Sequence, residues 1–252
     1  MIINYYYKVT IGFVTNSRMT NNYFGGTMTN LNEILKKDLK DYQGIPFWSW
    51  NDKLEKEELK RQIRQMKEAG LGGFFMHARG GLMTEYLGED WFAAVNACIE
   101  EAKAQNMNVW CYDENGWPSG FAGMKLLEDP SNHVHYLTFD IRDTFDEKAL
   151  AVYKLENKNI VRIFENSDGI GEYICIYDKT NSSLVDILNE EIVGKFIQET
   201  HEKYYERFKG DFGNAILGFF TDEPQYFRWD TAYTPIILKS FTDEYNKMFW
   251  IL

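Results

Sequence analysis

Two glutamates stand at equivalent places in this sequence, each just after a short apolar run. Glu114 follows the run 109–112, and Glu223 follows the run 216–220. Two carboxyl groups that flank one glycosidic bond can hydrolyse it, because one protonates the leaving oxygen while the other activates water or attacks the sugar. We therefore predict Glu114 and Glu223 as a catalytic pair, separated by roughly 6.5–9.5 Å in an inverting enzyme or by about 5–5.5 Å in a retaining one. The alternative is that one or both are ordinary polar residues of a loop or support such a site.

An aspartate precedes each of these glutamates: Asp113 and Asp222. Side chains alternate along a strand, so we expect the aspartates to point differently from the glutamates. They would orient Arg79 or the backbone, or bind a metal, and plain structural hydrogen bonding is the alternative. Arg79 would clamp a substrate oxygen or pair with Asp113. We place all three among the predicted substrate-binding residues.

The other predicted substrate-binding residues are His77, Trp48 and Trp117. His77 would bind a sugar hydroxyl or a metal, and a buried histidine with a structural role is the alternative. Trp48, Trp50 and Trp117 lie where apolar runs meet the following loops, so each would stack on a sugar ring or pack in the core. For His201, within a helical pattern, packing is the favoured role.

Strand-length apolar runs alternate with helical patterns from Gly44 onwards. We expect a buried strand in each of four runs: 45–50, 72–77, 108–113 and 215–220. Continuous apolar strands between amphipathic helices indicate a parallel sheet covered on both faces. Because reactive groups gather at the carboxyl ends of the strands in a parallel α/β barrel, this arrangement would bring the polar clusters together.

Two helices are predicted between these strands. The first is marked by Leu59, Ile63 and Met66, which recur at helical spacing. Asp52 followed by Glu55 resembles a capping box at its start, and Gly70 is a typical terminator. The second is marked by Trp91, Val95, Cys98, Ile99 and Ala102.

The alternation breaks between about 133 and 188, where short β-like runs predict a small β insertion. The runs are 136–141, 149–155, 160–164 and 173–177. One long helix is expected next, from Ile192 to Phe208, with an apolar or partly apolar residue at every fourth position. A last helix is expected over Pro235–Tyr245.

The fold class that follows is α/β, a (β/α)8 TIM-type barrel of which four strands are present by residue 221. Residues 31–252 would form a partial barrel with its β insertion at about 133–188. Residues 1–30 are polar and lack a core pattern, so we expect a poorly ordered extension. Only about 30 residues follow residue 221, too few for four more strands with their helices. The sequence therefore predicts a barrel truncated near its middle, with exposed sheet edges that favour self-association.

The polar clusters, taken in order, resemble glycoside hydrolase family 106, the α-L-rhamnosidases. The matching segments are Pro46-Phe47-Trp48-Ser49-Trp50-Asn51, Gly72-Gly73-Phe74, Arg79-Gly80-Gly81-Leu82, Tyr112-Asp113-Glu114, Trp117-Pro118-Ser119-Gly120, Thr200-His201-Glu202 and Phe220-Thr221-Asp222-Glu223-Pro224. The resemblance covers roughly residues 40–230. It implies a (β/α)8 catalytic domain with a loop insertion and an inverting mechanism. It also implies Glu114 as general acid, Glu223 as general base and a calcium ion near the site, whose ligands it does not place.

Family members are several times longer than this chain, so the chain is expected to represent the N-terminal part of the catalytic barrel and to turn over little substrate by itself. A catalytically silent sugar-binding or assembly module is therefore the second hypothesis. A third is a metal-dependent hydrolase that uses His77, Asp113, Asp222 and Glu223. Zinc sites usually need more histidine than these strand ends offer, which weakens the third.

The amino-acid composition limits the classes of molecule that the chain is expected to bind. The net charge is −11, which disfavours nucleic acids and anionic membranes because both require a basic surface. Apolar residues make up 44% of the chain, as in ordinary globular proteins. Three cysteines without a CxxC motif suggest neither a disulfide framework nor a zinc site. With no signal peptide or membrane-spanning run in the sequence, a carbohydrate substrate and a cytoplasmic location are expected.

Overall fold

The computed structural model describes residues 40–156, 159–165, 169–226, 228 and 230–245, so the predicted extension over residues 1–30 lies outside the described residues. The chain divides into two compact units. The first unit contains the residues up to Gly116 together with Glu202–Thr221. The second contains Trp117–His201 together with the residues from Asp222 onwards.

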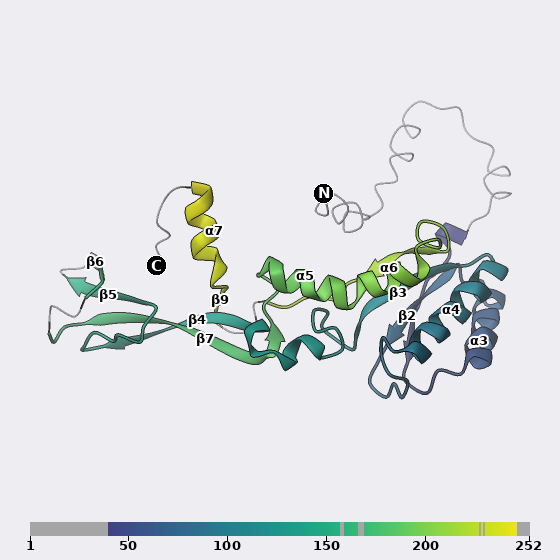
Figure 1. The fold of residues 1–252 in the computed structure, drawn as a ribbon, viewed down its shortest axis with the longest axis horizontal. Coiled ribbons are helices and arrows are strands. Elements are labelled where there is room, and N and C mark those ends of the chain that lie inside the picture. The colour runs from purple at the N-terminus through teal and green to yellow at the C-terminus, as the bar shows by residue number, and fades with distance from the viewer. Residues whose placement is uncertain (1–39, 157–158, 166–168, 227, 229, 246–252) are drawn as a thin grey trace, which may run out of the picture. The chain divides into compact units, whose positions relative to one another are not determined.

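A parallel sheet of four strands forms the centre of the first unit (Figure 1). Its strands, in spatial order, are β1 (Phe47–Trp50), β2 (Gly73–Ala78), β3 (Asn108–Asn115) and β8 (Ile216–Phe220). The four predicted strands and their parallel pairing are thereby confirmed. Among the described residues β1 and β8 are the edges of the sheet, so the structure shows a mixed α/β fold and does not show a closed barrel.

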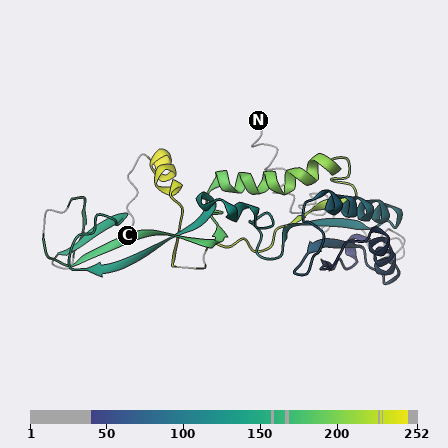
Figure 2. The same cartoon turned by 60° about the horizontal axis from the view of Figure 1, so that its bottom comes forward.

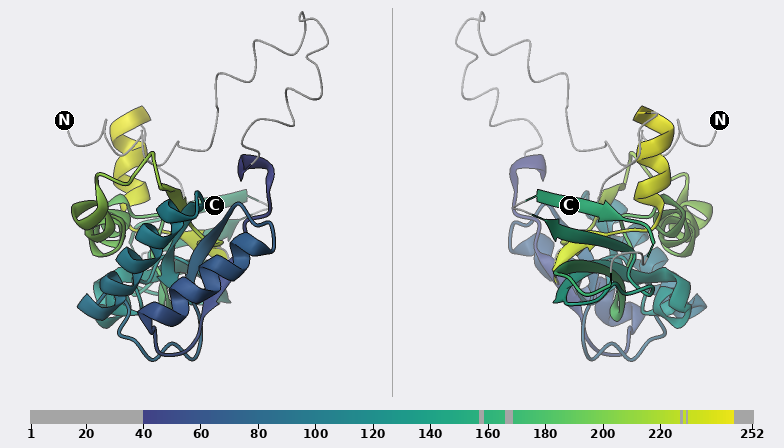
Figure 3. Two further views of the ribbon diagram at one scale, coloured as in Figure 1. Left: turned by 90° about the vertical axis from the view of Figure 1, so that its right-hand side faces the viewer. Right: turned by 90° about the vertical axis from the view of Figure 1, so that its left-hand side faces the viewer.

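Helices cover one face of this sheet. They are α3 (Lys56–Glu68), α4 (Glu89–Ala104) and α6 (His201–Phe208). Figure 3 (left) shows α3 and α4 side by side in front of the strands. Ile63, Val95 and Tyr204 are fully buried there in one apolar cluster with Phe74 and Val109 of the sheet. The periodicity that predicted α3 and α4 thus reflects real burial.

The opposite face of the sheet carries aromatic rings instead of helices. Phe47 lies 4.9 Å from both Phe75 and Phe220, between ring centroids, and Tyr112 stacks on Phe220 at 6.1 Å. Phe47 remains 49% exposed. The predicted cover on both faces is therefore seen as helices on one face and as aromatic side chains on the other, since a continuous apolar run signals burial without saying what buries it.

The two ends of α3 differ in how well the sequence predicted them. Gly70 ends the helix as expected: its φ is 84°, its N–H donates to Lys67, and the N–H of Leu71 donates to Met66. The predicted capping box is not formed. The N-cap residue is Glu55, which makes no side-chain capping bond. The Oδ1 of Asp52 accepts instead from the N–H of Lys53.

An antiparallel sheet of five strands organises the second unit (Figures 1 and 2). In spatial order its strands are β6 (Asn159–Ile163), β5 (Ala151–Glu156), β7 (Tyr173–Val185), β4 (His133–Arg142) and β9 (Thr231–Tyr233). The four predicted β-like runs of the insertion are therefore confirmed as strands. The remaining short elements are η1 (Lys40–Tyr42) in the first unit, and η2 (Lys125–Glu128), η3 (Pro130–Asn132), α5 (Glu190–Glu199) and α7 (Ile236–Tyr245) in the second. No helix in the described ranges is both long and apolar enough to cross a membrane.

The predicted long helix over 192–208 is two helices, so this prediction is wrong. Helix α5 ends at Thr200, whose φ of −120° and ψ of −81° are not helical, and α6 begins at His201. The hydroxyl of Thr200 donates to the carbonyl of Phe196 at 2.6 Å and contacts Nδ1 of His201 at 2.9 Å. Ser and Thr hydroxyls that bond the preceding turn compete with helix continuation, which favours a break here.

Candidate active site

A bulge distorts β3 where its carboxyl end carries Asp113 and Glu114. Met76 pairs with Cys111 and Ala78 pairs with Asn115, so the three residues 112–114 stand opposite the single residue His77. Bulges break strict alternation and re-aim side chains, often beside active sites. The expectation that Asp113 and Glu114 point to different sides depended on that alternation, which the bulge interrupts.

Both carboxyl groups at this strand end are buried. Asp113 is fully buried and Glu114 is 1% exposed. Oδ2 of Asp113 accepts a 2.6 Å hydrogen bond from the hydroxyl of Thr221, which directly follows β8. Oε1 of Glu114 accepts from the N–H of Asn115 at 2.9 Å. Two carboxyl groups held out of water at the end of a parallel sheet are a feature that packing alone does not require.

We expect Thr221→Val to lower the free energy of unfolding by about 1–3 kcal/mol, because the buried carboxyl group of Asp113 loses one hydrogen-bond donor while the shape of the Thr221 side chain is kept. Denaturant unfolding of the full chain measures this. Thr138→Val is the matched control, since among the described residues the Thr138 hydroxyl has no hydrogen bond. Equal stability of the two variants would show that the Thr221 hydroxyl contributes nothing to holding Asp113.

Tyr86 is a residue of this site that the sequence analysis missed. It lies in the loop after β2, and its hydroxyl is buried without a hydrogen-bond partner among the described residues. Burial raises the pKa of Tyr86 well above its usual value, and nearby Tyr204, Glu114 and Asp113 raise it further. The phenol therefore feels the charge of both carboxyl groups. Its position in the loop that follows β2, at the carboxyl end of the sheet, is the sequence signal by which Tyr86 could have been found.

His77 lies on the aromatic face of the sheet. It is 5% exposed, and its ring centroid is 3.8 Å from that of Tyr112 and 5.2 Å from that of Phe47. The hydroxyl of Tyr112 in turn donates to the carbonyl of Gly116 at 2.8 Å. The structure thus places His77 among the rings beside the bulge, as the buried-histidine alternative requires.

Trp48 and Arg79, two further predicted substrate-binding residues, also belong to the first unit. Trp48 is on the helix-covered face, where its Nε1–H donates to Gln62 of α3 at 2.8 Å. Its ring also packs edge-on against Phe74. Arg79 is exposed, and its side chain makes no ion pair with Asp113 in the described part of the chain. Substrate binding by these two residues stays a prediction.

The second unit holds Trp117 and Glu223 close together. The Nε1–H of Trp117 donates to Oε2 of Glu223 at 3.3 Å. Beside this contact, the N–H of Ser119 donates to the carbonyl of Asp222 at 2.9 Å, and the N–H of Asp222 donates to the hydroxyl of Ser119 at 2.8 Å. The two loops that carry the predicted residues are thus tied by reciprocal bonds. Glu223 belongs to this unit and Glu114 to the first, so their predicted spacing stays a prediction.

The backbone of Glu223 is held in an unfavourable conformation. Its φ is 44°, in the left-handed region that non-glycine residues rarely occupy. It also precedes Pro224, and a residue before proline is normally extended. Such outliers cost about 1–3 kcal/mol and persist only where the surroundings impose them, often at functional sites.

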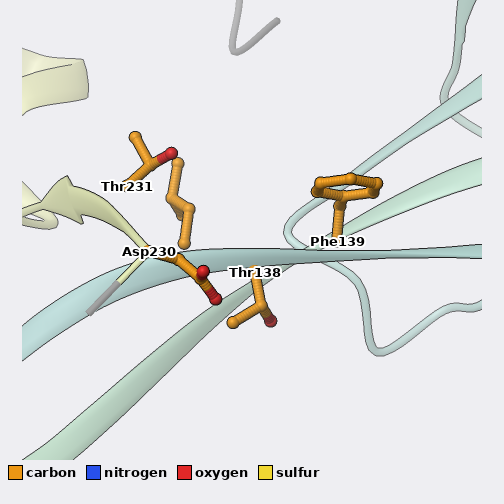
Figure 4. Close-up of a pocket in the computed structure, with 5 residues that line it drawn as sticks. Thr138, Phe139, Asp230 and Thr231 are labelled. Atoms are coloured by element: carbon orange, nitrogen blue, oxygen red, sulfur yellow. The ribbon is translucent and has the colours of Figure 1, made fainter.

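Two hollows in the second unit are lined by other residues. One, of about 420 Å³, is lined by Leu137, Thr138, Phe139, Asp230 and Thr231 (Figure 4). Figure 4 shows Thr138 and Phe139 pointing to opposite sides of β4. The other, of about 450 Å³, lies along β5 and β6. Neither contains a predicted site residue.

The calcium ion implied by the resemblance is not supported by the donor set. Within the described ranges no three His, Cys, Asp or Glu side chains come together in a way that could hold a metal ion. We therefore assign calcium no ligands and no step in the chemistry below. The metal-dependent alternative likewise gains no support from these residues.

Comparisons with known proteins yield a weak structural similarity. No protein-family model matches the chain, and no curated protein does. Among solved structures the chain is similar to a rhamnosidase from Novosphingobium sp. PP1Y, at 18% identity and a TM-score of 0.37. The match covers 50% of this chain and 13% of that one. A TM-score this low does not establish a common fold, so no feature of this chain is assigned from it.

Proposed function

We propose that the chain is a glycoside hydrolase of the α-L-rhamnosidase type, in which Glu114 donates a proton to the leaving oxygen and Glu223 activates water. The observation that carries this is the buried carboxyl group of Glu114 at the bulged carboxyl end of β3. The acid of a glycoside hydrolase is a carboxyl group that gives its proton to the leaving oxygen. Glu223 is exposed, which suits a base that works on water.

The arrangement of the first unit supports the finer proposal of a (β/α) barrel wall. In such barrels the helices form an outer ring, and side chains from the strands fill the interior. Here α3 and α4 pack on one face only, while Phe47, Phe75 and Tyr112 line the other. The predicted acid lies at the carboxyl end of the strands, where barrel enzymes carry their reactive groups.

A sugar-binding module without catalysis is the second candidate, and the exposed ring of Trp117 favours it. This side chain is 45% exposed, and its N–H already holds a carboxylate. Aromatic faces with polar groups at their edge suit sugar rings.

One experiment separates the two candidates. The full chain is incubated with an aryl α-L-rhamnoside, and NMR follows both the release of L-rhamnose and contact of the glycoside with the protein. Release with inversion at the anomeric carbon is expected for the hydrolase. Contact without release would favour the binding module, and neither contact nor release would contradict both.

A further inference from the structure

Trp117 is tied to Glu223 by a contact that ordinary packing does not explain. With 45% of its side chain exposed, Trp117 contributes less apolar burial than a core tryptophan such as Trp91, which is fully buried. Its ring nitrogen nevertheless donates to Oε2 of Glu223 across 106 residues of sequence. An indole can only donate, so this bond requires an accepting oxygen on the carboxyl group.

The backbone around this contact is fixed on both sides. Ser119 is 2% exposed, and its two reciprocal bonds with Asp222 join the loops that carry Trp117 and Glu223. Asp222 is adjacent to Glu223, whose left-handed φ of 44° must be imposed by its neighbours. The side chain of an exposed glutamate would still rotate freely, and among the described residues the Trp117 bond is the hydrogen bond that restrains it.

We infer that Trp117 is a positioning residue for Glu223: its indole N–H holds Oε2 and leaves Oε1 to face the reacting water. Among the described residues, no hydrogen bond to Oε1 is found. A carboxylate with one oxygen held and the other open presents a single directed acceptor. Misplacement of a reacting group by about 1 Å can cost about 10²-fold in rate. Restraint of the Glu223 carboxylate would therefore favour a fast reaction. The reacting water comes from the proposed function, so that part of the inference rests on it. The restraint of the Glu223 side chain by Trp117 does not.

The test uses the full chain labelled with ¹⁵N-tryptophan, which has seven indole N–H signals. The signal lost in Trp117→Phe, or in Trp117→Tyr if the first variant does not fold, belongs to Trp117. In Glu223→Ala we expect that signal to shift more than any other indole signal and its hydrogen to exchange faster with solvent. Glu128→Ala, which removes an exposed carboxylate of the same unit, should leave it in place. An unmoved Trp117 signal in Glu223→Ala would overturn the inference.

The reverse measurement follows Glu223 itself. With ¹³C-glutamate labelling, the signal missing from Glu223→Ala identifies this side chain, and Trp117→Phe should make it more mobile than in the parent chain. Unchanged mobility would mean that Trp117 does not restrain the carboxylate. If the chain hydrolyses an aryl rhamnoside, Trp117→Phe should lower kcat while KM is retained. If the parent chain does not hydrolyse the glycoside, the proposed function is contradicted. The two NMR measurements test the positioning role independently of that result.

Discussion

Replacing Glu223 by glutamine is expected to lower turnover of an aryl α-L-rhamnoside by about 10²–10⁴-fold, the usual worth of general-base assistance. The change keeps the shape of the side chain and removes the group that would deprotonate water. Single-turnover assays with the full chain in excess over substrate measure the loss even when turnover is slow. Glu128→Gln is the matched control, because Glu128 is an exposed glutamate of the same unit. A Glu223→Gln variant as fast as this control would remove Glu223 from the reaction.

The same assay separates the two carboxyl roles. Glu114→Gln should slow substrates with poor leaving groups far more than activated aryl glycosides, because a good leaving group needs little protonation. Glu223→Gln should slow both kinds of substrate alike. Equal sensitivity of the Glu114 variant to all leaving groups would contradict its assignment as the acid.

Trp91→Ala is expected to lower the free energy of unfolding by about 3–5 kcal/mol, the cost of truncating a fully buried aromatic residue. Trp91 of α4 packs against Trp50 and Tyr86, with ring centroids 5.0 and 4.9 Å away. Its Nε1–H donates to the hydroxyl of Tyr204 of α6 at 3.0 Å. The substitution therefore opens a cavity and also removes a bond between two helices.

Denaturant unfolding of the full chain, followed by circular dichroism, measures this loss. Tyr204→Phe gives a graded comparison, because it keeps the ring and removes only the acceptor, which should cost about 1–3 kcal/mol. Trp117→Ala, at a half-exposed tryptophan, should cost less than either. If Trp91→Ala were no more harmful than Trp117→Ala, the described core of the first unit would be incorrect.

The local elements of this protein follow from its sequence. Leu59, Ile63 and Met66 mark one face of α3, and Gly70 ends that helix because glycine reaches a positive φ at little cost. The apolar runs that became β2 and β3 were equally visible, and so was the ionisable pair Asp113 and Glu114 at a strand end. These features depend on neighbours a few residues apart, which is the range over which a sequence pattern is informative.

Contacts between distant segments were decided only in the tertiary structure. The stripe through α5 and α6 has one spacing, yet Ile192 packs in a cluster with Val134 while Tyr204 packs in the core around Trp91. Periodicity cannot tell which core a residue joins, so the break at Thr200 was not predicted.

The bulge at residues 112–114 also escaped prediction, because it is set by how β3 pairs with β2. The bonds that hold the predicted carboxylates, from Thr221 to Asp113 and from Trp117 to Glu223, join residues more than a hundred positions apart. The sequence thus determined which side chains are predicted to do chemistry, and the pairing of distant strands and loops decided what holds them.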